Sequence, residues 1–184
     1  DALMAASLSR QSAQSLIVPI APGYGGTPEM AAELKLALES DRLFLAHDIK
    51  LQIRRLAANG WPVPRRIADT MIMSYVLNPG LPSHAFANVV RDRLKQDVLT
   101  RKDLQKTAPL FAIDHEIGSS LLGPYQDYLG EKSEIAIALA GVLEPELQRD
   151  HSLVKIYDTL ELPLIPVLGR MEARGIRIDV GLLK

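Results

Sequence analysis

The fold class follows from residues 42–60, which read Arg42-Leu-Phe-Leu-Ala-His-Asp-Ile-Lys-Leu-Gln-Ile-Arg-Arg-Leu-Ala-Ala-Asn-Gly60. This stretch opens with a short apolar run, 42–46, which is flanked by charge and has the length of a buried strand rather than a helix. The residues from Ile49 to Asn59 then predict a helix, and Gly60 ends it. A strand that leads directly into a helix indicates an α/β layer.

The residues before this stretch extend the same pattern. Two short extended segments, 3–9 and 15–20, are joined by a polar connection and predict a hairpin. The segment 21–28 holds two prolines and three glycines and predicts a loop, after which Thr27 or Pro28 begins a helix that runs to about Glu39. Strands and helices therefore alternate through the first half of the chain.

After Gly60 the pattern becomes mostly helical. The segment Trp61 to Pro64 crosses to Ile67–Thr70, where we expect a new helix that ends before Asn78. From residue 84 onward the pattern predicts helices, including one over 132–150 and one over 153–174, the latter with a proline kink or a broken start. The expected breaks lie at Pro109, at Gly123-Pro124 and near Gly130. The sequence thus predicts an α/β fold with a helix-rich C-terminal half.

Composition narrows the class of protein. The chain has 184 residues, 47% of them hydrophobic, a net charge of −1 and no cysteine, which favours one folded domain and excludes disulfides and thiolate metal sites. We find neither a long apolar run nor a signal peptide, so we expect a cytoplasmic protein that does not contact a membrane. Because the sequence starts at Asp1 without a methionine, we also expect it to be a fragment.

The balanced charge provides no overall field to attract a polyanion such as DNA. A nucleic-acid interface would therefore need a local basic patch. We regard solvated helix or loop faces as the simpler interpretation of the basic clusters. These clusters are Arg54-Arg55, Arg65-Arg66, the group Arg91, Arg93 and Lys95, and Arg101-Lys102.

Two segments resemble the family A DNA polymerases, the DNA polymerase I type of bacteria. Ile67-Ala-Asp-Thr-Met-Ile-Met-Ser-Tyr-Val-Leu-Asn-Pro-Gly80 resembles the family segment FDTMLLSYVLNPG, and His84 stands where the family has the histidine of HDMDSLA. Leu153-Val-Lys-Ile-Tyr-Asp-Thr-Leu-Glu-Leu-Pro-Leu-Ile-Pro-Val-Leu-Gly-Arg-Met-Glu-Ala-Arg-Gly-Ile-Arg-Ile-Asp179 resembles YxxIELPLIPVLARMEARGIxID. Weaker similarities between and before these segments occur in the same order, so the resemblance covers nearly the whole chain.

The resemblance implies a ribonuclease H-like (DnaQ-like exonuclease) fold, in which helices flank a small sheet. It implies a 3′-5′ exonuclease-like domain over 1–150 and, over 151–184, a helix that leads into the polymerase domain. DNA and the polymerase domain in cis are the implied partners. In the family, a strand with the Asp-x-Glu pair of the first exonuclease motif precedes the strand that 3–9 resembles, and it has no counterpart after Asp1.

The resemblance also locates the positions of the nuclease metal ligands. A two-metal nuclease holds two divalent ions about 4 Å apart with roughly four carboxylates. The family's second motif, GQNLKYD, matches residues 46–52, with Asp48 in place of the asparagine and Gln52 in place of the metal-binding aspartate. In the third motif, Tyr-x-x-x-Asp, the match puts Tyr128 at the tyrosine and Lys132 at the aspartate. We therefore expect an inactive exonuclease without a metal or cofactor.

A shift in register within the third motif would bring Glu131 or Glu134 to the metal position. The exonuclease would then be active and would use Mg²⁺ or Mn²⁺. The sequence Asp114-His115-Glu116 suggests a metal pair, but acids after Pro109 are better explained as first-turn residues of a helix. His47 and His84 have no second ligand at helical spacing, and His151 lies in a charged turn.

Three functions remain open at the level of sequence. The first is a structural domain that helps to position DNA without cutting it, and the second is an active 3′-to-5′ exonuclease. The third is a protein-interaction module, since an apolar stripe on the last predicted helix could make the isolated chain dimerise. That stripe consists of Leu160, Leu164, Leu168 and Met171.

Overall fold

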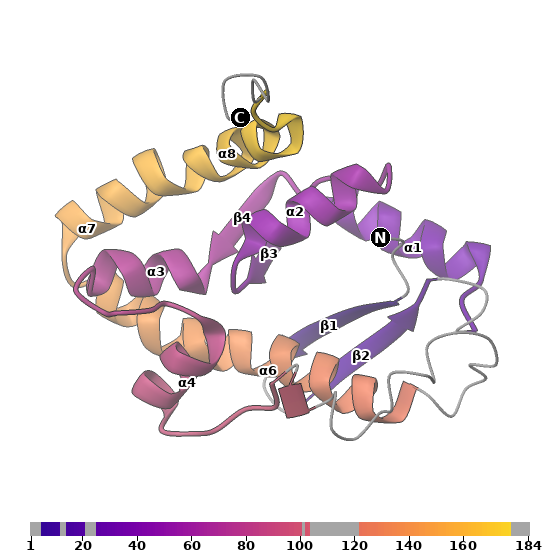
Figure 1. The fold of residues 1–184 in the computed structure, drawn as a ribbon, viewed down its shortest axis with the longest axis horizontal. Helices are drawn as coiled ribbons and strands as arrows, with labels where there is room; N and C mark the ends of the chain where they lie inside the picture. The colour runs from indigo at the N-terminus through magenta and orange to yellow at the C-terminus, as the bar shows by residue number, and fades with distance from the viewer. Residues whose placement is uncertain (1–4, 12–13, 21–24, 101, 104–121, 178–184) are drawn as a thin grey trace, which may run out of the picture.

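A computed structural model describes residues 5–11, 14–20, 25–100, 102–103 and 122–177 of the chain. Within these residues, α-helices predominate over two small sheets (Figure 1). The strands are β1 (Ala5–Gln11), β2 (Gln14–Pro19), β3 (Leu43–Ala46) and β4 (Arg66–Asp69). The helices are α1 (Pro28–Glu39), α2 (Ile49–Ala58), α3 (Thr70–Leu77), α4 (Phe86–Leu94), α6 (Leu122–Leu147), α7 (His151–Ile156), the π-helix η4 (Tyr157–Glu161) and α8 (Leu162–Arg174). The predicted α/β class with a helix-rich C-terminal half is confirmed.

The hairpin and the first two helices lie where the sequence predicts them. β1 and β2 pair in antiparallel fashion, with an irregularity between Ser9 and Gln11. The hydroxyl of Thr27 accepts a hydrogen bond from the Met30 amide at 3.3 Å and caps α1. These features are local, because turn and capping residues close in sequence determine them.

β4 was not predicted. The sequence predicts a helix start at Ile67–Thr70, whereas Arg66–Asp69 form a strand that pairs in parallel with β3, from Leu43 opposite Arg66 to Ala46 opposite Asp69. The helix begins only at Thr70, since the Asp69 side chain accepts the Met71 amide and caps α3. Pairing with a strand more than 20 residues away overrides the local preference of this segment.

α6 is one continuous helix and packs against β1, β2 and α3. The expected break near Gly130 is therefore wrong, and Gly123-Pro124 lie in the first turn, where proline is tolerated. Gly130 is buried, and a Cβ atom added there would lie 2.6 Å from the Ser15 hydroxyl of β2. This glycine permits close packing between the hairpin and the helix.

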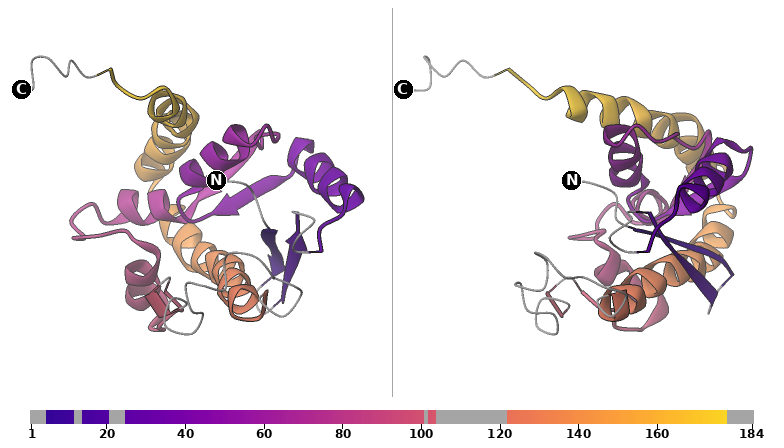
Figure 2. Two further views of the ribbon diagram at one scale, coloured as in Figure 1. Left: turned by 45° about the vertical axis from the view of Figure 1, so that its right-hand side comes forward. Right: turned by 90° about the vertical axis from the view of Figure 1, so that its right-hand side faces the viewer.

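Two apolar clusters hold the elements together. The larger cluster joins β4, α3, α4, α6 and Tyr157, and Figures 1 and 2 show α6 running past these elements and the hairpin. Its buried members include Val89, Val90, Leu139, Leu143 and Leu147. The smaller cluster consists of Ile49, Ile53 and Ile165 and joins α2 to α8.

The C-terminal segment is helical throughout from His151 to Arg174, without the broken start that was one of the two expectations, and it contains a π-helical turn before its first proline. α7 continues into η4, and α8 begins at Leu162, directly before Pro163. Proline lacks an amide hydrogen and its ring collides with the carbonyl group four residues earlier, which favours a wider turn at that point. None of the helices that the structure describes is long and apolar enough to cross a membrane.

Candidate functional site

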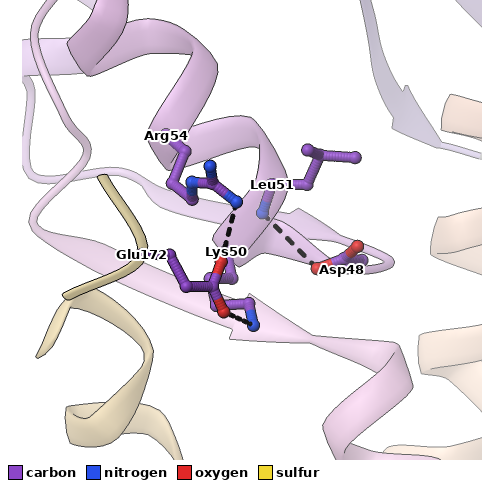
Figure 3. A network of polar contacts seen from close by, with 5 residues as sticks. All are labelled: Asp48, Lys50, Leu51, Arg54 and Glu172. Carbon is purple, nitrogen blue, oxygen red and sulfur yellow. Dashed lines mark hydrogen bonds and ion pairs between the residues drawn. The ribbon is translucent and has the colours of Figure 1, made fainter. Parts of the chain in front are cut away.

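Asp48 and its neighbour His47 lie where β3 ends and α2 begins. Asp48 adopts a left-handed backbone conformation (φ 60°) and caps α2, with its Oδ1 accepting the Leu51 amide at 3.4 Å (Figure 3). A non-glycine residue with positive φ is uncommon, although aspartate is among the residues that tolerate it best. The surrounding structure must therefore hold this turn in place.

Asp69 holds the turn. Its side chain is fully buried, and its two carboxylate oxygens accept the backbone amides of Asp48 (3.1 Å), Ile49 (2.9 Å) and Met71 (2.8 Å). Burial raises the pKa of this carboxyl group, and the amide hydrogen bonds oppose the rise. The Asp69 amide in turn donates to the Tyr157 hydroxyl at 2.9 Å. One buried carboxylate thus joins the starts of α2 and α3.

The His47 side chain points into the same region and is uncharged at neutral pH. Its Nε2–H donates to the His84 carbonyl at 2.8 Å, and its Nδ1 accepts from the Thr70 hydroxyl, 3.0 Å away. Burial lowers the pKa of His47 to about 4, and its contact with the carbonyl group opposes this effect. The ring also packs edge-on against Phe86, with centroids 5.2 Å apart.

Lys132 and Tyr128 reach this region from α6. The two residues are one helical turn apart, and the Lys132 ammonium lies 4.8 Å from the centre of the Tyr128 ring and 4.4 Å from that of Phe86. Lys132 and Asp48 both act electrostatically on His47, with opposite effects on its pKa. Of the four predicted positions, the structure places Tyr128 beside Lys132, and both Lys132 and Asp48 act on His47.

Gln52, the fourth predicted position, is exposed on α2. Of the alternative acids, Glu131 accepts the Leu99 amide at 2.8 Å and Glu134 is half-buried on α6. Asp114 and Glu116 lie outside the described residues. In the part of the chain that the structure describes, no three His, Cys, Asp or Glu side chains are grouped so that they could hold a metal ion.

Several of the basic residues near the sheet and on α4 are paired with acids. Figure 3 shows the Glu172 carboxylate of α8 between Lys50 and Arg54 of α2, at 2.5 and 2.7 Å. Other pairs join Arg91 to Asp97 and Arg93 to Glu146, each at 2.8 Å. Ion pairs of this kind favour the interpretation of these basic clusters as solvated faces.

The hydrogen-bonded partners of the site are not evident from the sequence. The spacing of His47 and His84 indicates no partner, but His47 donates to the His84 carbonyl, and the His84 ring lies 3.0 Å from the Ser74 hydroxyl. Neither contact forms a metal site. The residues are 37 and 10 positions apart, so no helical or strand spacing could have indicated the two pairs.

Comparisons of sequence place the chain among DNA polymerases. No family model matches it. It is 29% identical over 187 residues to the DNA polymerase I of Pseudomonas aeruginosa, covering 96% of this chain and 20% of the relative. It is 32% identical over 153 residues to that of Rhizobium leguminosarum, covering 79% and 14%. The chain thus spans about a fifth or less of the length of these relatives.

Solved structures share the fold. The POL domain of Pol1 from M. smegmatis, in complex with DNA primer-template and dNTP, superposes with a TM-score of 0.68 at 23% identity, over 92% of this chain and 25% of that one. NrnC of Brucella melitensis superposes with a TM-score of 0.65 at 18% identity (91% and 74%), and with 0.64 at 17% identity when bound to pGG (94% and 77%). Together with the sequence matches, these likenesses lead to one assignment. The chain belongs to family A, the DNA polymerase I type of DNA polymerase.

Proposed function

We propose that this chain is the 3′-5′ exonuclease-like domain of a DNA polymerase I, with a ribonuclease H-like fold, and that it has lost nuclease activity. In this proposal residues 1–150 form the exonuclease-like domain and 151–184 lead into the polymerase domain. Its role is to help position DNA within the parent polymerase. The likenesses to a Pol1 POL domain solved with DNA and to an NrnC bound to pGG support a nucleic-acid ligand.

The proposal depends most on Lys132, which the resemblance puts at the position of a metal-binding aspartate. Its ammonium group lies close to the rings of Phe86 and Tyr128 and acts electrostatically on His47 beside Asp48. A fixed positive charge there repels a divalent cation, and a nuclease of the two-metal type depends on carboxylates to bind its ions. Gln52 supports the same conclusion, since an amide oxygen is an uncharged and weaker ligand for Mg²⁺ or Mn²⁺ than a carboxylate.

The proposal also includes a surface that contacts the rest of the polymerase. The apolar stripe, which extends over η4 and α8, is exposed, with Leu160 at 53%, Leu168 at 40% and Met171 at 62%. The relatives are about five times longer than this chain or more, so the polymerase domain in cis is the partner that we propose for this surface.

Titration of Mn²⁺ into the purified chain, together with digestion of end-labelled single-stranded DNA, tests the loss of activity. We expect no binding at millimolar metal and intact DNA. A Gln52→Asp/Lys132→Asp double variant is the informative control, because it restores two carboxylates and should increase the affinity for Mn²⁺. Stoichiometric metal binding by the natural sequence, with shortening of the DNA from its 3′ end, would show an active exonuclease and refute the proposal.

A further inference from the structure

Lys132 is a half-buried cation without an anionic partner in the described part of the chain. Its ammonium forms neither an ion pair nor a hydrogen bond with another described residue, and its contacts there are the ring faces of Phe86 and Tyr128. By contrast, Lys50 and Arg54 of α2 share the carboxylate of Glu172. Among the described residues, therefore, no anion neutralises the charge of Lys132.

The surroundings fix this charge in position without neutralising it. Cation–π contacts hold an ammonium over a ring without neutralising its charge, and an N–H group that points away from the ring can still donate to an acceptor. His47 nearby is uncharged at neutral pH, so it neither adds charge nor competes for an anion. Asp48 is the acid that acts on the same histidine, and its carboxylate is engaged with the start of α2.

We propose that the Lys132 ammonium binds a phosphodiester group of single-stranded DNA directly, in place of a metal ion. A compact ammonium with three donors suits a single phosphate oxygen, and the two rings hold it ready for that contact. This inference rests on the proposed function, which provides the DNA. It adds that the former metal position remains a phosphate-binding site and that binding there needs no divalent cation.

The test measures the binding of a fluorescein-labelled oligothymidylate to the whole chain by anisotropy, in EDTA and over a series of salt concentrations. Lys132→Met retains the aliphatic stem and removes the charge. We expect its affinity at low salt to fall by about fivefold, and the slope of log K against log salt to decrease by about 0.7, the value for one lost phosphate contact on a single strand. Lys132→Arg keeps the charge and should keep the slope.

Lys35→Met is the matched control. Lys35 also lies over an aromatic ring, 5.1 Å from the centre of Trp61, but it is exposed on α1. The Lys35→Met substitution removes the same charge from the chain as Lys132→Met, so it measures the non-specific part of the loss in DNA affinity. Equal losses in the two methionine variants, no measurable binding in EDTA, or binding that requires a divalent ion would each overturn the inference.

A second measurement uses the natural sequence and does not depend on the folding of a variant. Acetylation of lysines by a limiting reagent, followed by mass spectrometry, should show that DNA protects Lys132 and leaves Lys35 reactive. Protection of neither lysine refutes the inference. If the chain neither binds metal nor digests DNA and Lys132 is unprotected, the inference fails while the proposed function stands. Digestion of DNA with Mn²⁺ instead refutes the proposed function itself.

Discussion

Replacing Asp69 with alanine should destabilise the protein more than any loss of a surface hydrogen bond. The carboxylate accepts three backbone amides, those of Asp48, Ile49 and Met71, and it is fully buried. Alanine leaves all three donors unpaired in a site closed to water. Since each unsatisfied buried donor costs about 1–3 kcal/mol and the chain relaxes in part, we expect a loss of about 3–5 kcal/mol in the free energy of unfolding.

The Asp69→Asn variant distinguishes the effect of losing the negative charge from the effect of losing the oxygen atoms that accept hydrogen bonds. The amide oxygen can keep the place of Oδ1, which serves Asp48 and Met71, but the NH₂ group then faces the Ile49 amide as a second donor. Removing the charge also removes the energetic cost of burying a charged group, which is the effect that raises the pKa of Asp69. We therefore expect a smaller loss than for alanine, about 1–2 kcal/mol.

Urea unfolding followed by circular dichroism at pH 7 measures both losses. Asp150→Ala is the control, because Asp150 accepts the Ser152 amide at 2.8 Å as the cap of α7 but lies exposed. Its effect should be a small fraction of the effect at Asp69. If Asp69→Ala changes the free energy of unfolding by less than about 1 kcal/mol, the three amides find other partners and the reasoning is wrong.

Two further predictions concern the same region and the packing of α6. The pKa of His47 is lowered to about 4, so its contribution to the stability of the folded state is complete above pH 6.5 and is lost as the pH falls from 6.5 toward 4. In NMR spectra, the imidazole proton resonances of His47 should not titrate near pH 6.5. A midpoint near pH 6.5 would contradict the burial of this side chain. Gly130→Ala should destabilise the protein despite the better helix propensity of alanine, because its Cβ meets the Ser15 hydroxyl at 2.6 Å. Adding Ser15→Ala should recover the loss in thermal unfolding, and a double variant no more stable than Gly130→Ala would exclude this contact as the cause.

The features that depend on near neighbours along the chain can be predicted from the sequence alone. The β1–β2 hairpin, the capped start of α1 at Thr27, and α2 after β3 follow from periodicity, turn residues and capping side chains within a few positions of one another. Two segments, 67–80 and 153–179, also indicate the relationship to DNA polymerase I, because the order of their residues is specific.

The way in which distant segments complete the site depends instead on the tertiary fold. Arg66–Asp69 form a strand because they pair with β3. α6 continues through Gly130, where β2 approaches the helix closely. The contact of Lys132 with Phe86 and the bond of His47 to the His84 carbonyl join residues 46 and 37 positions apart. Contacts of this kind leave no periodic pattern in the chain, since they depend on which surfaces the core brings together after the helices and strands have formed.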